Sequence, residues 1–201
     1  LLILCLVCLS ILGCGGNDTD ETSNESKEYR TVTDMRGVEV RVPVDIQRVV
    51  DISDGFTTSV MQCLGEQNKV VGVGSLNLKE IDGYTFATSD GEEYSFTDGM
   101  NPVTYLNPWL KDLPAVAQYG VAVSYETVAS LEPDVVIVRI GFCSLNTMEY
   151  GEEEDIQKTI NTLESLGIPI VVVYGPPALK EPSVGKISEE IRVIGQVFGK
   201  E

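Results

Sequence analysis

The chain has 201 residues, of which 31 are acidic and 14 basic, and its net charge is −17. This balance argues against a nucleic-acid partner, because phosphate binding requires clustered Lys and Arg. No His occurs in the sequence, which removes the commonest metal ligand and the commonest acid–base catalyst together. The length suits one domain of ordinary size or slightly more.

The N-terminal stretch is an uncharged apolar run that ends just before Cys14. It is too short to span a bilayer, which needs about 20 apolar residues, but it fits the apolar region of a signal peptide. Gly13 before Cys14 is typical of the site where a lipoprotein signal peptidase cuts after the thiol is acylated. We therefore predict a signal peptide over 1–13, clipped at its start, and lipid attachment at Cys14. The alternative is an ordinary signal peptide or anchor that happens to contain Cys.

Residues 14–28 are predicted to be an acidic tether. After Cys14 the segment holds no large apolar side chain and cannot bury enough surface to fold. A tethered lipoprotein would lie at the extracytoplasmic face of the cell membrane. Two cysteines follow the tether in the sequence, Cys63 and Cys143, and their wide spacing does not match a zinc-binding motif. Cys63 is predicted to lie in the core, and a disulfide between the two is left open.

The first half of the folded part alternates strands with a helix. The pattern predicts a hairpin over 31–42, a β-branched strand over 48–52, a helix over 56–64 and a short strand over 70–73. The helix shows Phe56, Val60, Cys63 and Leu64 on one face. Strand, helix and strand in this order are typical of an α/β unit with a parallel sheet.

The stretch 76–113 interrupts this alternation with a predicted second β-hairpin. The predicted cross-strand pairs are Phe86 with Tyr94 and Tyr84 with Phe96, around a turn with a left-handed Gly91. Tyr105 and Trp109 follow in a predicted loop. The aromatic face could cover the core or line a pocket, and core cover is the preferred interpretation.

The second half returns to strands and helices. We predict a short helix from Ser124, a buried strand over 134–138, an amphipathic helix over 152–166, a strand over 168–174 and a helix from Ser183 to the end. The last helix shows Ile187, Ile191, Ile194 and Phe198 on one face and is predicted to run on without a cap. The fold class is therefore α/β, a Rossmann-like lobe with a mainly parallel sheet.

Four segments in this order resemble the iron-chelate and vitamin B12 family of ABC-importer binding proteins: TVTDMRGVEVRVP (31–43), RVVDISDGFTTSVMQCLGEQNKVVGVG (48–74), SLEPDVVIV (130–138) and LESLGIPIVVV (163–173). In that family two α/β lobes are joined by one long helix, and the ligand sits between the lobes. The resemblance implies an N-terminal ligand-binding lobe over 29–182 and the start of the interlobe helix over 183–201. It also implies that the second lobe is missing from this chain.

Candidate ligand-binding residues lie at the carboxyl ends of the predicted strands, where the crevice of an α/β sheet opens. They are Ser53, Asp54, Phe56, Arg139, Phe142 and Tyr174, together with Tyr119, where the family's ligand loop falls. The aromatic rings offer rigid faces to a corrinoid or an aryl chelate, and Arg139 could pair with carboxylates or catecholates. The alternatives are an Arg139 on the rim, solvated or paired with Glu149, and core positions for Phe142 and Tyr174.

One more residue is assigned by the resemblance alone. In the vitamin B12-binding relatives, a Glu at the start of the helix before the L-x-P-D strand docks with Arg on the transporter. The matching position here is Glu126, in SYETVASLEPD. The alternative is a first-turn acid that stabilises its own helix.

The resemblance implies a monomer that captures a small-molecule metal chelate outside the cell and delivers it to an ABC permease and ATPase. A ferric siderophore is preferred, then cobalamin or another corrinoid, then haem; no cofactor or resident metal is expected. A rival is a metal-cofactor enzyme of nitrogenase-like fold, although the Cys and His spacings of such enzymes are absent here. A receptor or adhesion lipoprotein that has lost transport is a third class. No nucleophile elbow, Walker loop or dinucleotide motif occurs, so we predict no enzyme.

Overall fold

The structure is a computed structural model, and it describes residues 28–75, 78–80, 82–117, 123–141, 153–179, 181 and 183–200. At its centre is a four-stranded sheet in the order β4-β3-β7-β8. Its strands are β3 (Val49–Ile52), β4 (Val70–Val73), β7 (Val135–Ile140) and β8 (Ile170–Tyr174). Each neighbouring pair is parallel, and every residue of β3 and β7 is buried, as expected for a sheet covered on both faces. The predicted α/β fold class is confirmed.

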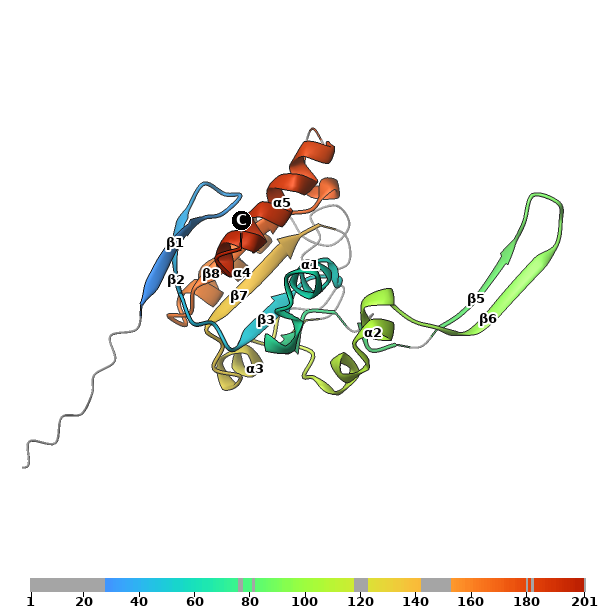
Figure 1. Ribbon diagram of the computed structural model, residues 1–201, viewed down its shortest axis with the longest axis horizontal. Coiled ribbons are helices and arrows are strands. Elements are labelled where there is room, and N and C mark those ends of the chain that lie inside the picture. Colours follow the sequence, from blue (N-terminus) through green and yellow to red (C-terminus); the bar gives the residue numbers. More distant parts are fainter. Residues whose placement is uncertain are drawn as a thin grey trace, which may run out of the picture.

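Helices cover both faces of this sheet (Figure 1). The face bearing α1 (Phe56–Leu64) and α5 (Val184–Val197) also carries the small sheet of β1 (Tyr29–Thr33) and β2 (Glu39–Pro43). The other face packs against α3 (Tyr125–Ser130) and α4 (Glu153–Glu164). Alternate residues of β3, β7 and β8 point into the two resulting cores. Single turns of 3-10 helix lie at η1 (Gln67–Lys69) and η4 (Pro176–Ala178).

The order of the strands creates a switch point between β3 and β7. After β3 the chain passes through α1 to β4 on one side, and it later returns to β7 on the other side of β3. The connections from these two strands therefore diverge at their carboxyl ends. In open α/β sheets a ligand crevice forms at such a point.

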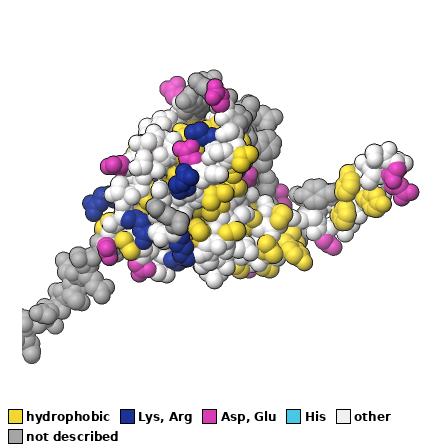
Figure 2. Space-filling view, turned by 45° about the horizontal axis from the view of Figure 1, so that its top comes forward, with side chains coloured by type: hydrophobic (Ala, Val, Ile, Leu, Met, Phe, Trp, Pro, Cys, Tyr) yellow, Lys and Arg dark blue, Asp and Glu magenta, His cyan; other side chains and the backbone are white. Residues whose placement is uncertain are grey.

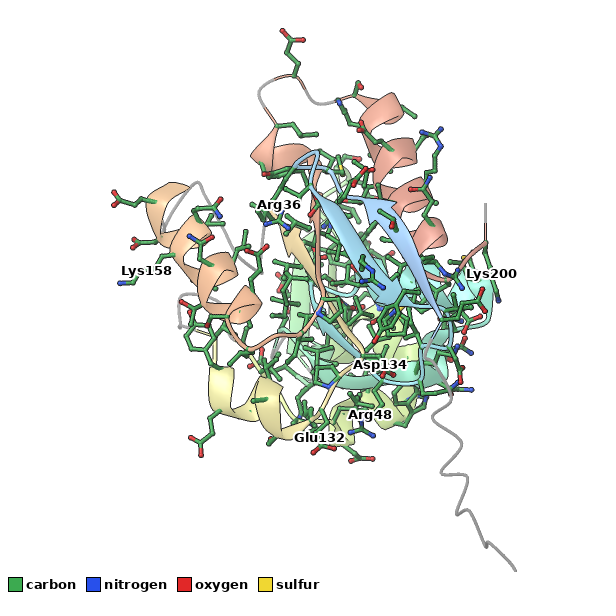
Figure 3. All side chains as sticks on the ribbon, turned by 90° about the vertical axis from the view of Figure 1, so that its left-hand side faces the viewer. Arg36, Arg48, Glu132, Asp134, Lys158 and Lys200 are labelled. Atoms are coloured by element: carbon green, nitrogen blue, oxygen red, sulfur yellow. The ribbon has the colours of Figure 1, made fainter. Side chains whose placement is uncertain are left out.

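The opposite, amino-terminal ends of the same strands are fastened by one aspartate. The Asp134 carboxylate accepts the backbone N–H groups of Gln47 at 2.8 Å and Arg48 at 2.9 Å. The Arg48 guanidinium donates to the carbonyl of Leu131, so it also lies at this end (Figure 3). These bonds hold the entries to β3 and β7 side by side.

The β1-β2 hairpin is joined to the sheet through its turn. The buried Asp34 accepts from the backbone N–H of Val172 at 3.1 Å and from the Arg36 guanidinium at 2.8 Å. Arg36 reaches on to Glu164 at the end of α4, 2.9 Å away (Figure 3). One ionic cluster thus connects the hairpin, β8 and α4.

The second hairpin, β5 (Asp82–Ala87) and β6 (Glu93–Gly99), projects away from the body (Figures 1 and 2). The predicted register is confirmed, with Phe86 opposite Tyr94 and Tyr84 opposite Phe96, and Gly91 has φ 86°. The interpretation of its aromatic face as core cover is wrong, because Phe86 is 51% exposed and Phe96 is 55% exposed. The rings contact each other instead, with centroids 5.9 Å apart for Phe86 and Phe96. A local pairing rule fixes the register but not the direction in which a hairpin leaves the body.

The predicted loop after this hairpin is instead two short helices, α2 (Pro102–Leu106) and η3 (Pro108–Asp112). The Asn101 side chain caps α2 by accepting from the backbone N–H of Val103 at 2.9 Å, and Pro102 occupies the first helical position. Trp109 packs against the core, whereas Tyr105 is exposed.

The predicted inward faces of three helices need correction. Cys63 is exposed rather than in the core, because the buried face of α1 is formed by Thr57, Thr58, Val60 and Met61. Its candidate disulfide partner, Cys143, lies outside the described residues. Ile191 of α5 is exposed, since that helix buries Glu190, Val193, Ile194 and Val197. Leu166 also lies past the end of α4 and is partly exposed.

Helix α5 ends with a defined cap, contrary to the prediction that it runs on. The backbone N–H of Lys200 donates to the carbonyl of Gly195 at 2.9 Å, and that of Gly199 donates to Gln196 at 3.0 Å. Gly199 is left-handed, with φ 65°. These are the bonds of a Schellman motif, which terminates a helix.

None of the helices in the described part of the chain is long and apolar enough to cross a membrane. The predicted signal peptide and the lipid-attachment residue Cys14 lie outside the described residues.

Candidate functional site

The candidate site lies at the switch point, where residues from both diverging connections meet. Asp54 follows β3 in the loop before α1, and Arg139 is the next-to-last residue of β7. The Arg139 guanidinium donates from one nitrogen, Nη1, to both carboxylate oxygens of Asp54, at 3.1 and 3.3 Å. Sequence reasoning placed both residues in the crevice, and the structure brings them into contact.

Arg139 is almost entirely enclosed. Its Nε donates to Oε2 of Glu190 at 3.0 Å, and its Cζ lies 4.4 Å from the centre of the Phe56 ring, within range of a cation–π interaction. The residue is only 8% exposed. Arg139 is therefore not a solvated rim residue, and among the described residues its charged partners are Asp54 and Glu190. Glu149, the partner considered from the sequence, lies outside the described residues.

Gly175 makes room for this arrangement. It follows β8, and a Cβ atom added to it would lie 2.9 Å from Cζ of Arg139. Any larger residue would push the guanidinium out of its place between the two carboxylates. The break in the sequence after Tyr174 thus has a packing role beside the site.

Glu190 is the member of the site that sequence reasoning missed. It projects from α5 and is fully buried, and its second oxygen, Oε1, has no hydrogen-bond partner among the described residues. Burial raises the pKa of Glu190, and the hydrogen bond and charge of Arg139 oppose that shift. The sequence signal was present but weak, because Glu190 lies four residues before the buried Ile194 on the same helical face.

A second buried acid lies behind the site, at Asp51 of β3. One of its oxygens, Oδ2, accepts from the backbone N–H of Thr58 at 3.1 Å and from the Thr58 hydroxyl at 2.5 Å. The other oxygen, Oδ1, has no hydrogen-bond partner in the part of the chain that the structure describes, and burial raises the pKa of this carboxyl. The hydrogen bonds to Asp51 fasten the start of α1 to the sheet beneath the site.

The other sequence candidates divide into three groups. Ser53 is fully buried, and its hydroxyl accepts from the backbone N–H groups of Gly55 at 3.1 Å and Thr57 at 3.4 Å, so it organises the loop. Tyr174 is half-buried at the carboxyl end of β8, where it packs against the core. Tyr119 and Phe142 lie outside the described residues.

Glu126 lies in the first turn of α3, which packs against the other face of the sheet from α1 and α5. The Ser124 hydroxyl caps that helix by accepting from the backbone N–H of Thr127 at 3.3 Å. Glu126 is exposed, which both the docking and the helix-stabilising interpretations require.

The described residues contain no candidate site at which the protein itself could hold a metal ion. Among those residues there is no group of three or more Cys, Asp or Glu side chains placed to hold an ion.

Solved structures with a similar fold are described as solute-binding proteins. The chain matches the molybdate-bound periplasmic binding protein MolA of Haemophilus influenzae, with a TM-score of 0.57 and 21% identity over 85% of this chain. It matches the heme-binding protein HmuT with a TM-score of 0.52 and 21% identity over 89% of the chain. It also matches the periplasmic catecholate-siderophore binding protein VctP of Vibrio cholerae, with a TM-score of 0.52 and 16% identity over 86% of the chain. The chain has the fold of one lobe of a periplasmic solute-binding protein.

This lobe spans less than half the length of those structures, covering 46% of MolA, 44% of HmuT and 46% of VctP. No protein-family model matches the sequence, and no curated protein matches it significantly. The fold expected from the resemblance is thus confirmed by comparison of structures, although the comparisons of sequence found no match. On this lobe, the contact between Asp54 and Arg139 marks the edge of the sheet at which a crevice is expected.

Proposed function

We propose that the protein is the substrate-binding component of an ABC importer, which captures a ferric siderophore outside the cell. The observation that carries the proposal is the convergence of Asp54, Phe56 and Arg139 at the switch point of a solute-binding lobe. The matched structures include proteins named for binding heme, a catecholate siderophore and molybdate. Iron chelates and oxyanions are therefore the ligand classes associated with this fold.

The proposed site would bind the chelate without changing it chemically. Phe56 is half-buried at the switch point, and we propose that its ring is the first aromatic contact of a chelate. We propose Tyr174, half-buried at the end of the neighbouring strand β8, as a second contact. We propose Tyr119 and Phe142 as further aromatic contacts from the two connections that complete the crevice. The side chain of Asp54 is 31% exposed, so it is the charged group of the cluster that a ligand would meet first.

Delivery would use surfaces away from the crevice. We propose that the exposed Glu126 contacts an Arg of the permease, and that a lipid on Cys14 keeps the monomeric protein near the permease and its ATPase. A single exposed ion pair contributes only about 0–1 kcal/mol, so docking would need further contacts.

Two ligand alternatives and one enzymatic alternative remain for comparison. Cobalamin or another corrinoid would use the same aromatic surface, and haem would need an axial ligand other than His, which the chain lacks. The enzymatic alternative is a metal-cofactor enzyme of nitrogenase-like fold. Transport is preferred over catalysis, because the matched structures are described as binding proteins.

The test is a titration of the full-length protein with a ferric trihydroxamate, a ferric tricatecholate, cyanocobalamin and haem. The single Trp of the chain, Trp109, allows fluorescence to follow binding, and calorimetry provides an independent measurement. Binding of an iron chelate, weakened by Phe56→Ala but not by Asp155→Asn on the exposed surface of α4, would support the proposal. Binding of none of the four compounds would refute it.

A further inference from the structure

The charge of Arg139 is already compensated within the protein. Nη1 binds Asp54 and Nε binds Glu190, so one cation faces two carboxylates. The charged residues described at the switch point are therefore two carboxylates and one guanidinium, although the most conspicuous of them in the sequence is the arginine.

The geometry also prevents Arg139 from turning to a ligand. The Phe56 ring covers the guanidinium, Gly175 packs against it, and Glu190 holds its Nε from the buried side. An anionic ligand could form a bidentate pair with Arg139 only by displacing Asp54, which would leave that carboxylate beside a second negative charge. The arrangement thus opposes the capture of anions.

We infer that this crevice selects uncharged or cationic chelates over anionic chelates of similar size. The inference rests on the proposed function and specifies its substrate class. Ferric iron bound by three hydroxamates is neutral, and a further ammonium group on the ligand makes it cationic. Three catecholates leave the complex triply negative, and Coulomb repulsion at a few ångströms from Asp54 then disfavours it.

The test compares the affinities of the neutral ferric trihydroxamate and the ferric tricatecholate for the full-length protein. We expect the neutral chelate to bind at least roughly tenfold more tightly at low salt, with a smaller ratio at high salt. Asp54→Asn removes the exposed negative charge and should shift the ratio toward the tricatecholate by roughly tenfold. Asp155→Asn, which changes the net charge equally on the exposed surface of α4, should leave the ratio unchanged.

The outcomes separate this inference from the proposed function. A wild-type protein that binds the tricatecholate as tightly as the trihydroxamate, or more tightly, would overturn the charge selectivity and leave chelate capture intact. Equal ratios for Asp54→Asn and Asp155→Asn would also overturn it, provided that both variants unfold at the wild-type temperature. If neither chelate binds, the proposed function fails and the inference fails with it.

Discussion

Replacing Arg139 by Leu should destabilise the protein strongly, because the substitution leaves the buried carboxylate of Glu190 without its charged partner. Glu190 is fully buried, and among the described residues its carboxylate accepts one hydrogen bond, from Nε of Arg139. Breaking a buried ion pair by removing one partner costs about 3–5 kcal/mol. Asp54 adds little to this figure, since its side chain is 31% exposed and water can replace the lost pair. For a chain of this length, the loss corresponds to a fall of roughly 6–20 °C in the unfolding temperature.

A double variant distinguishes this cause from simple loss of packing. Arg139→Leu combined with Glu190→Leu removes both charges, and replacing a buried pair by apolar residues is often neutral or stabilising. Urea unfolding followed by Trp109 fluorescence should place the double variant within about 1 kcal/mol of the wild type. The reasoning is refuted if the single variant loses less than about 1 kcal/mol, or if the double variant is as unstable as the single one.

Three further predictions concern the framework around the site. Burial raises the pKa of Asp51, so the folded chain binds the carboxyl proton of Asp51 more tightly than the unfolded chain does. The protonated carboxyl therefore contributes its full stability below the pKa of the unfolded chain, about 3.9, and this contribution declines as the pH rises through the pKa of the folded chain. Asp51→Asn should therefore be more stable than the wild type by about 1–3 kcal/mol at pH 7, with the difference vanishing near pH 3 in urea unfolding, and an equal difference at both pH values would contradict this cause. Gly74→Ala should cost about 1–3 kcal/mol in the same assay, because its Cβ would lie 2.4 Å from Cα of Ile52, whereas Gly83→Ala, with its nearest neighbour at 3.5 Å, should cost less. Replacing 84–96 by a two-residue turn should change the unfolding free energy of the body by no more than about 0.5 kcal/mol, and a larger loss would show that the hairpin supports the core.

The central sheet could be predicted from the sequence because its signals are local. The first four residues of β7, 135–138, are all apolar, and every residue of the strand is buried as a covered parallel strand requires. The register of the second hairpin was predictable for the same reason, since a tight turn at Gly91 determines which residues face each other. Neither signal says how an element is oriented on the body, and the hairpin's projection into solvent accordingly went unforeseen.

Helix faces were predicted less well, because hydrophobicity alone does not identify the buried side. The apolar pattern of α5 favoured a face containing Ile191, but the helix instead buries Glu190, which gains a charged partner inside the protein. A buried acid is unfavourable until its partner is known, and that partner is 51 residues away in sequence. The same reasoning applies to Cys63, whose helical neighbours Val60 and Met61 carry the contact with the core.

Arg139 shows most directly what residue type can and cannot establish about a site. The sequence placed it correctly at the carboxyl end of a parallel strand, where ligands bind, and its charge then favoured an anionic ligand. The electrostatic character of a crevice depends on the sum of its charges, and Asp54 and Glu190 are separated from Arg139 by 85 and 51 residues. Only the fold brings the three together, and once they are together the arginine neutralises acids of its own protein. The position of a residue can therefore be inferred from the periodicity of the sequence, whereas its effect on ligand selection depends on the partners that the fold supplies.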